Sequence, residues 1–495
     1  MAGVIALFVI LFALMVWWPV SAPPPPAAAD FAIQAVTVID TEGEADLAGA
    51  TVVVRDGMIS AVGPTGEVPV PAGMAVVDGR GRYLIPGLWD MHSHVWKHAE
   101  QLQFPLYVAH GVTGVRDMLS WPDESEVGAR TIEDKRALRQ RVDNGDVIGP
   151  RLVAIASLAV DGASPRFAGL APMFSVRTPA EARTLVAHEA GRGADFIKMY
   201  NQLPRDAYFA LMEEARARGL PVAGHRPYSV TLQEAAAAGQ RSIEHGRDFL
   251  YECFPEAAAF RTAMQSNKAR HPWMRAMVQG HDPAACDALF AVLVAHGMWL
   301  TPTHVIRRED ALADDPAYRN DPNARYIHAL YRFFWRSDLD DTVAEDPSPA
   351  GRQAYRDFYA KGLELTGRAH AAGVKVLAGT DHPIAGLSLH QELEELVKAG
   401  LTPRGALRAA TYDAAAFLQR DATNGSVRPG KVADLVLLDA DPRVAVSNTR
   451  RIALVSVAGR RYDRAALDGL LQHTEEKAAS WSLGGKILWA VVRGL

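Results

Sequence analysis

Cysteine is nearly absent from this chain: its 495 residues include only Cys253 and Cys286. Two isolated thiols exclude a cysteine-type zinc site. They could form one disulfide if the protein resides in an oxidising compartment. We expect two ordinary thiols instead, because the separation of two residues in sequence says nothing about their distance in space.

Basic residues are missing from the N-terminus, where the first Lys or Arg is Arg55. Residues 2–20 carry no charged or strongly polar side chain, and Pro23 to Pro26 follow them. This run is either an anchor that nearly spans a bilayer or the core of a secretory signal, with small residues at 27–29 for cleavage. Both interpretations predict an exported, periplasmic or otherwise extracytoplasmic protein, with membrane association through residues 2–20 if the segment is retained.

The C-terminal tail, residues 471–495, is apolar from Trp481 onward. It is either an amphipathic helix on a membrane surface or a helix docked on the protein, and we favour docking. Clusters of Lys and Arg are also lacking, and the formal net charge is −5. We therefore expect no nucleic acid partner.

The content of hydrophobic residues, 49%, and of charged residues, 22%, excludes a disordered chain. The length accommodates one α/β barrel of about 250 residues or more and a second small domain. Short apolar runs alternate with helical patterns through the middle of the chain, which is typical of βαβ units around a parallel sheet. Eight strands are predicted, at Tyr83–His94, Thr113–Asp117, Leu152–Ala156, Phe196–Tyr200, Pro221–His225, Ser242–His245, Trp299–Thr303 and Val374–Thr380.

Eight such strands with helices between them predict a closed (β/α)₈ TIM-like barrel. Local signals agree: Thr178, Pro179 and Glu181 form a capping box at the start of a helix over Thr178–Arg192. Asp56-Gly57 indicates a tight hairpin turn near the N-terminus. Long insertions before and after the seventh strand could cover the barrel mouth as lids.

Polar side chains suited to metal binding follow several of these strands. Two of them, His92 and His94, have a spacing that places both side chains on one face of the first strand. Active sites of this architecture form at the C-terminal ends of the strands. The residues that occupy such ends are His92, His94, Lys198, His225, His245 and Asp381. The sequence therefore predicts a metal site at the barrel mouth.

Three motifs resemble the amidohydrolase superfamily, in particular its imidazolonepropionase-related and prolidase-like branch. They are Pro86-Gly87-Leu88 followed by His-x-His, residues 110–117 (HGVTGVRD), and residues 424–436 (NGSVRPGKVADLV). The resemblance implies a barrel over 86–412 and a small β-sandwich formed by the two flanks, residues 30–85 and 413–470. Residues 1–29 would be the signal or anchor with its proline-rich linker.

The resemblance also implies two divalent metal ions, with zinc the leading candidate. His92, His94 and Asp381 would hold one ion, and His225 and His245 the other. Lys198 would carry a CO₂-derived carbamate that bridges both, because a bare ammonium would repel two dications. Such a site lowers the pKa of a bridging water to give hydroxide near neutral pH. Asp381 would accept the proton of that hydroxide and pass a proton to the leaving amine.

The leading functional prediction is hydrolysis of an amide bond in a small substrate, such as an N-acyl amino acid or a dipeptide. A lactone, ester or organophosphate hydrolase with the same site, and a non-catalytic membrane-tethered binding protein, remain as alternatives. Five residues near the predicted mouth are further candidates for substrate contact: Tyr200, Arg226, Tyr228, His304 and His382. The substrate's identity and the formation of a homo-oligomer are left open by the sequence.

Overall fold

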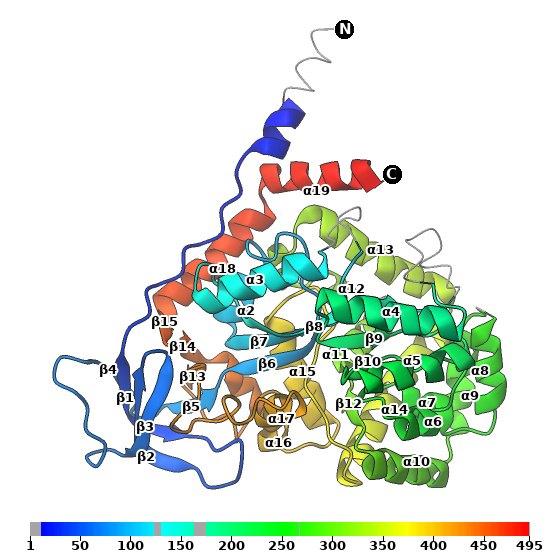
Figure 1. Ribbon diagram of the computed structural model, residues 1–495, viewed down its shortest axis with the longest axis horizontal. Helices are drawn as coiled ribbons and strands as arrows, with labels where there is room; N and C mark the ends of the chain where they lie inside the picture. The colour runs from blue at the N-terminus through cyan, green and yellow to red at the C-terminus, as the bar shows by residue number, and fades with distance from the viewer. Residues whose placement is uncertain (1–10, 123–129, 163–174, 267, 495) are drawn as a thin grey trace.

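The protein is described as a computed structural model covering residues 11–122, 130–162, 175–266 and 268–494. A barrel surrounded by helices forms the larger part, and a separate, mostly antiparallel sheet lies beside it (Figure 1). The chain has the mixed α/β architecture expected from its alternating pattern. Part of the predicted anchor, residues 1–10, lies outside the described residues.

Seven parallel strands form the barrel wall in the spatial order β12-β11-β10-β9-β8-β7-β6. Their bounds are β6 (Leu88–Ser93), β7 (Val112–Asp117), β8 (Arg151–Val160), β9 (Phe196–Met199), β10 (Val222–Gly224), β11 (Ser242–Glu244) and β12 (Trp299–Thr301). All seven were predicted, and all are buried. Side chains at their C-terminal ends are therefore held by a rigid wall.

The predicted eighth strand, Val374–Thr380, does not form a regular strand. Its backbone instead bonds to both edges of the seven-stranded sheet. On one side the amide of Leu377 donates to the carbonyl of Leu300 on β12 at 2.8 Å, and on the other the amide of Met91 on β6 donates to the carbonyl of Ala378 at 2.9 Å. This segment bridges β12 and β6, and it brings Asp381 next to His92.

The predicted first strand, Tyr83–His94, is in fact two strands. β5 (Tyr83–Pro86) belongs to the separate sheet, and β6 belongs to the barrel. The break falls at Gly87, where a Cβ atom would lie 2.1 Å from Oγ1 of Thr113. Glycine is therefore required where the chain passes from one sheet to the other.

Helices connect the barrel strands on the outside. They are α2 (Gln103–Ala109), α3 (Ile132–Asn144), α4 (Pro179–Arg192), α5 (Arg205–Ala217), α6 (Leu232–Ala238), α10 (Pro283–His296) and α14 (Pro349–Ala371). Thr178 caps α4 through the predicted capping box with Glu181, and Pro179 occupies its first turn. Three helices follow the closing segment: α15 (Leu387–Lys398), α16 (Pro403–Ala409) and α17 (Tyr412–Phe417).

Both long insertions are helical. The first contains α7 (Asp248–Glu252), α8 (Ala257–Gln265) and α9 (His271–Gln279), and the second contains α11 (His304–Leu312), α12 (Pro316–Arg319), η3 (Pro322–Tyr326) and α13 (Ala329–Glu345). A disulfide joins Cys253, at the end of α7, to Cys286 on α10. Our expectation of two ordinary thiols was wrong, because the first insertion folds back and brings the two Cα atoms to 5.1 Å.

The two flanks of the barrel meet in one eight-stranded sheet. Its strands are β1 (Phe31–Val38), β2 (Leu47–Arg55), β3 (Met58–Pro64), β4 (Ala75–Asp78), β5, β13 (Leu435–Leu438), β14 (Ile452–Val457) and β15 (Arg460–Asp463). The hairpin predicted at Asp56-Gly57 joins β2 to β3, and both residues have positive φ. The short helix η4 (Val446–Arg450) precedes β14.

Two helices complete the C-terminus, α18 (Arg464–Ala478) and α19 (Trp481–Gly494). α19 lies beside the described part of the N-terminal segment, and both project from the body of the molecule (Figure 1). Within the described ranges, none of the helices combines the length and the apolar character needed to cross a membrane.

Candidate metal centre

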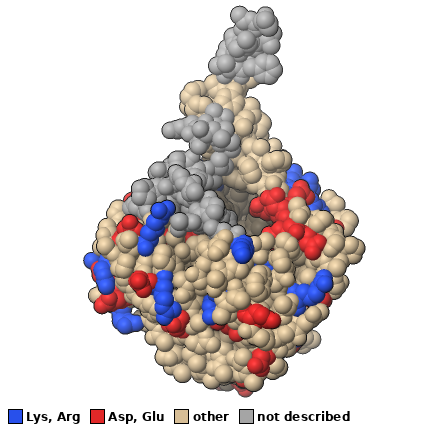
Figure 2. All heavy atoms as spheres, turned by 90° about the vertical axis from the view of Figure 1, so that its right-hand side faces the viewer, with Lys and Arg blue, Asp and Glu red and all other residues tan. Residues whose placement is uncertain are grey.

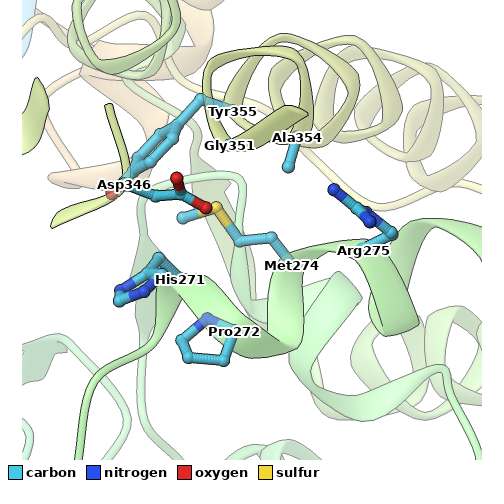
Figure 3. Close-up of a pocket in the computed structure, with 8 residues that line it drawn as sticks. All are labelled: His271, Pro272, Met274, Arg275, Asp346, Gly351, Ala354 and Tyr355. Carbon is cyan, nitrogen blue, oxygen red and sulfur yellow. The ribbon is translucent and has the colours of Figure 1, made fainter. Parts of the chain in front are cut away.

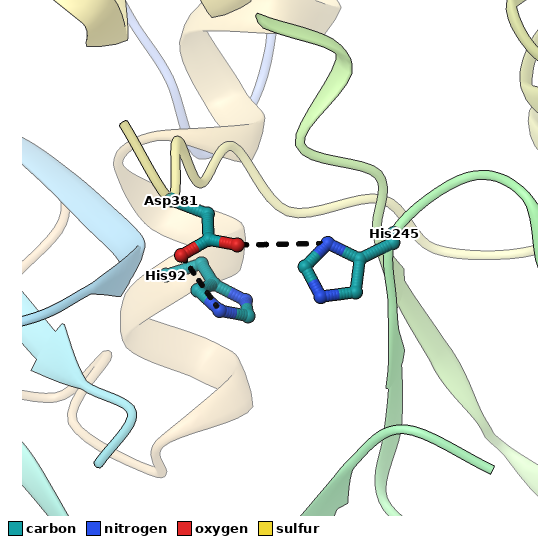
Figure 4. Close-up of side chains that lie close together, drawn as sticks. All are labelled: His92, His245 and Asp381. Atoms are coloured by element: carbon teal, nitrogen blue, oxygen red, sulfur yellow. Dashed lines mark ion pairs between the residues drawn. The ribbon is translucent and has the colours of Figure 1, made fainter. Parts of the chain in front are cut away.

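Four of the predicted residues, His92, His94, His245 and Asp381, converge at the barrel mouth. Nε2 of His94 lies 2.9 Å from Oδ1 of Asp381, and Nε2 of His92 lies 3.7 Å from the same oxygen. Nδ1 of His245 approaches Oδ2 of Asp381 at 3.9 Å. Figure 4 shows the carboxylate of Asp381 between the rings of His92 and His245. Ligand atoms of these three residues lie within 4.8 Å of one another, so the group could hold a divalent ion.

A second pair of histidines lies beside the first group. Nε2 of His225 and Nε2 of His245 are 2.9 Å apart, so the two nitrogens face a common point. The other ring nitrogens are occupied: Nδ1 of His225 lies 2.8 Å from Oδ1 of Asn201, and Nδ1 of His245 lies 2.7 Å from Oγ1 of Thr303. Such outer partners fix the ring orientation and the tautomer of a ligand histidine.

Lys198 lies near the C-terminal end of β9, between these two groups. Its side chain is buried, and its charge influences the pKa values of His92, His225 and Asp381. Its ammonium has neither a hydrogen bond nor an ion pair with any residue that the structure describes. Burial lowers the pKa of Lys198 to about 8. The charges of Glu244 and Asp381 oppose this shift, but neither acid contacts the ammonium directly. A buried ammonium without such a contact is costly.

Three of the site histidines, His92, His225 and His245, are neutral at physiological pH. Burial lowers the pKa of His92 to about 4, and it lowers the pKa values of His225 and His245 well below their usual range. Burial alone would raise the pKa of Asp381, but His92 and His94 together outweigh it and lower that pKa below its usual range. Neutral imidazoles and an ionised carboxylate are the forms that bind a divalent metal.

The backbone at the mouth adopts conformations that are rare for residues other than glycine. His245, Thr303 and Asp381 have φ values of 69°, 47° and 54°. Each follows a strand or the closing segment, and the left-handed turn redirects its side chain. Strain of this kind persists where the surrounding structure enforces it, and it is common at active sites.

A buried ion pair behind the histidines was not predicted from the sequence. Nδ1 of His92 lies 2.9 Å from Oε2 of Glu244, and Nη2 of Arg116 donates to both oxygens of Glu244 at 2.9 Å. Burial would raise the pKa of Glu244, yet the charge of Arg116 and the hydrogen bond with His92 lower it to about 2. Glu244 directly precedes His245, and Arg116 lies in the motif at residues 110–117. Only the three-dimensional structure shows that these two residues are in contact.

Asp90 performs a related role on β6. Its carboxylate accepts a bond from the amide of His92 at 3.1 Å and from the hydroxyl of Thr380 at 2.7 Å. It thereby ties the strand that carries His92 to the segment that carries Asp381.

The five candidates for substrate contact differ in their placement. Tyr200 stacks on the ring of His225, with centroids 4.3 Å apart. His304 is buried, and its Nε2 lies 3.0 Å from Oγ1 of Thr366. His382 contacts Tyr318 and Glu309 through Nε2, at 3.2 and 3.4 Å.

Arg226 and Tyr228 are placed in the protein interior. The guanidinium of Arg226 lies 3.3 Å from Asp248 and 3.2 Å from Glu252, both on α7. The ring of Tyr228 packs against Tyr251 and Phe260. These contacts join β10 to the first insertion.

Arg247, two residues after His245, is a mouth residue that sequence reasoning missed. After burial, the charge of Arg247 contributes to the lowered pKa values of His225 and His245. The charge of Arg307 also lowers the pKa of His245. In the described parts of the chain the guanidinium of Arg247 makes no hydrogen bond or ion pair, whereas Arg307 is paired with Asp310 at 2.6 Å. Arg247 is therefore a cation near His225 and His245 whose guanidinium has no direct contact with an acid, although the charge of Asp248 acts on it.

A pocket of about 240 Å³ lies elsewhere, between α9 and α14 (Figure 3). His271, Arg275, Asp346 and Tyr355 are among its lining residues. None of the predicted site residues lines it, and we assign it no role.

Comparison with known proteins identifies the chain's relatives. The model of the amidohydrolase family matches residues 83–462, which include the whole barrel and the returning strands of the second sheet. The chain belongs to the amidohydrolase family. It is a metal-dependent type of hydrolase, and its His/His/Asp group is suited to a divalent ion.

Three proteins illustrate how similar this chain is to known members of the family and to solved structures. Ochratoxinase of Aspergillus niger is 22% identical over 458 residues, which cover 83% of this chain and 81% of that protein. The structure of a bottromycin amidohydrolase has a TM-score of 0.68 and 24% identity, with 91% of this chain and 90% of that chain covered. A Xaa-Pro dipeptidase structure has a TM-score of 0.61 and 19% identity, with 88% and 100% covered. These structural likenesses show the fold.

Proposed function

We propose that this amidohydrolase cleaves the C–N amide bond of a small substrate, such as an N-acyl amino acid or a dipeptide. Two divalent ions, zinc foremost, would be held by the six predicted ligands: His92, His94, Lys198, His225, His245 and Asp381. The observation that carries the proposal is Lys198, whose buried ammonium makes no direct contact with an acid and acts through its charge on His92, His225 and Asp381.

Carboxylation would resolve the anomaly at Lys198. Because burial lowers its pKa to about 8, part of the amine is neutral near neutral pH. A neutral amine adds CO₂ to form a carbamate anion and releases one proton to water. An anionic oxygen donor suits two dications, whereas an ammonium repels them.

The protein's own residues have distinct roles in this reaction. Bound divalent ions supply a water of lowered pKa and polarise the scissile carbonyl. Asp381 is ionised and lies at the centre of the site, so it can accept a proton from the attacking water and return one to the leaving amine. Glu244 and Asp90 hold His92 in place while this occurs.

Arg247 supports a substrate that ends in a carboxylate. A guanidinium binds a carboxylate well, and Arg247 is unpaired beside His245. N-acyl amino acids and dipeptides carry a carboxylate close to the scissile amide. The dipeptidase among the relatives is named for a substrate of this class.

Export is a second part of the proposal. It is supported by the apolar run over residues 2–20 and by the disulfide between Cys253 and Cys286, since disulfides persist in oxidising compartments. Cell fractionation of the full chain tests it: we expect the protein in the extracytoplasmic or membrane fraction, and recovery in the cytosol would contradict it.

The test of activity is a panel of N-acyl amino acids and dipeptides, each paired with its C-terminally amidated form. We expect turnover of the free acids by the wild type and loss of turnover in Asp381→Asn. In Arg247→Ala we expect KM for the free acids to rise about tenfold or more and KM for the amidated forms to stay unchanged. Arg183→Ala, at an exposed arginine on α4, is the matched control. Turnover of esters or lactones without any amide hydrolysis would contradict the proposal.

A further inference from the structure

The two ends of the chain form one apolar surface. Twelve large hydrophobic side chains are exposed in the described residues. Nine of them belong to three segments that lie together, namely residues 11–18, α13 and α19, and we call these nine the aromatic face. Its members are Leu11, Leu14, Trp17, Trp18, Phe333, Phe334, Trp481, Leu488 and Trp489.

The N-terminal segment is fixed to α19 by specific contacts. The ring of Phe12 lies 6.1 Å from that of Trp489, and Trp18 lies 6.0 Å from Trp481. The ammonium of Lys486 donates to the carbonyl of Val16 at 2.5 Å. Segments at opposite ends of the sequence therefore share one packed unit, which is unusual for a leader that is removed.

α13 continues the same unit. Leu330 and Tyr331, on its first turn, pack with Leu483 and Ile487 of α19. Phe333 and Phe334 follow within one helical turn, and their exposed fractions are 67% and 45%. Since α13 belongs to the insertion before the closing segment, the aromatic face includes the barrel domain as well as the chain ends.

The face also adjoins the loop that leaves the metal centre. Leu102 packs in the cluster of α19, and Nε2 of Gln101 donates to the carbonyl of Val20 at 3.2 Å. Nε2 of Gln103, two residues after Gln101, donates to the carbonyl of His94 at 2.9 Å. The aromatic face is thus on the side of the barrel that carries His94.

We propose that the aromatic face docks on the surface of a lipid bilayer, with residues 11–20 retained in the mature protein. Four of its nine side chains are tryptophan, whose apolar ring and polar N–H suit the membrane–water interface. The chain that precedes it, residues 1–10, contains only apolar side chains and glycine, which extends the apolar character beyond the face. α19 has no acidic residue, so anionic headgroups meet no repulsion there.

The distribution of charged side chains on the surface agrees with docking on a lipid bilayer. In Figure 2 the described atoms of the projecting part, drawn in tan, include no Lys, Arg, Asp or Glu on the side in view, whereas the body below carries many of both signs. A contiguous apolar surface of this kind is uncommon on a soluble monomer and marks an interaction site. Exposed aromatic side chains on a projecting part of the molecule can insert into the interfacial layer of a lipid bilayer.

The experiment is flotation of the full chain with vesicles of phosphatidylcholine and phosphatidylglycerol. We expect the wild type to float and the double variants Phe333→Ser/Phe334→Ser and Trp481→Ser/Trp489→Ser each to bind about tenfold less, because each removes apolar area from the contact. Val444→Ser is the matched control, since Val444 is 79% exposed outside the face. Circular dichroism shows that each variant is folded.

Three results would overturn the proposal. The wild type could remain unbound, or all variants could float equally, which would place binding in the N-terminal run alone. The wild type could also form a dimer that the tryptophan variants dissociate, which would make a second copy the occupant. Because vesicle binding is measured without substrate, these results are distinguishable from failure of the proposed amide hydrolysis.

Discussion

Nε2 of His225 and Nε2 of His245 lie 2.9 Å apart at the ends of two adjacent strands, β10 and β11. Both rings are buried and neutral, and each has its other nitrogen bonded to a neighbouring oxygen. When Nδ1 of each ring carries the proton, both Nε2 atoms present lone pairs to each other. A cation bound by both nitrogens satisfies these lone pairs.

Lys198→Ala should remove the bridging ligand. We expect the metal content to fall below that of the wild type and activity to fall by about 100-fold or more, because the proposed water loses its activation. Added formate or acetate should restore part of the activity by supplying a carboxylate in the vacated space. Lys268→Ala, at an exposed lysine, is the control. Full metal content and activity in Lys198→Ala would show that the lysine is not a ligand.

Glu244→Gln should weaken the site without removing a ligand. The amide cannot orient His92 as the carboxylate does, so we expect metal affinity to fall about 10-fold to 100-fold. It also leaves Arg116 buried without its charge partner, which should cost about 3 kcal/mol or more of unfolding free energy. Competition with a chelator measures the first effect and denaturation the second. Glu213→Gln, at a glutamate with 70% side-chain exposure, should change neither.

Stability should fall in mild acid because histidines are buried in neutral form. Burial lowers the pKa of His110 to about 4, whereas the unfolded chain has the ordinary value of about 6.5. Between these values the unfolded state binds more protons, so stability is present above pH 6.5 and is lost as pH falls toward 4, by up to about 3 kcal/mol. Denaturation at several pH values measures this slope. His110→Gln should flatten it, and an equal slope in both proteins would exclude His110 as the cause.

The disulfide should stabilise the first insertion. Cys253 and Cys286 are 33 residues apart in sequence, and a crosslink over such a loop is worth about 3 kcal/mol. We expect the double variant Cys253→Ala/Cys286→Ala to unfold at lower denaturant concentration, and reduction of the wild type to have the same effect. Titration that finds two free thiols in the folded, unreduced protein would contradict the pairing.

The sequence predicted most of the barrel and the set of polar strand ends. Apolar runs and the His-x-His spacing carry those signals locally, and Lys198, His225 and His245 each follow a run that became a strand. The closing segment was predicted as a strand, because Val374 to Ala378 is as apolar as the others. Its hydrogen bonds to β6 and β12 depend on where those strands meet, which no local pattern encodes.

Contacts between distant segments were the main omission. Arg116 and Glu244 meet across strands that are not neighbours in sequence, and Arg226 forms ion pairs with two acids on α7. Sequence reasoning placed Arg226 at the mouth because it follows His225, but α7 covers it. Arg247 stands on the mouth instead, and only the three-dimensional structure distinguishes the two.

Metal analysis of the folded chain, purified with bicarbonate, tests the central claim most directly. The account requires about two divalent ions per wild-type chain, and a mass increase of one CO₂ plus one CH₂ on the peptide that contains Lys198 when the carbamate is trapped as its methyl ester. One ion or none per chain, in protein shown to be folded and supplied with zinc and bicarbonate, would contradict the two-metal site.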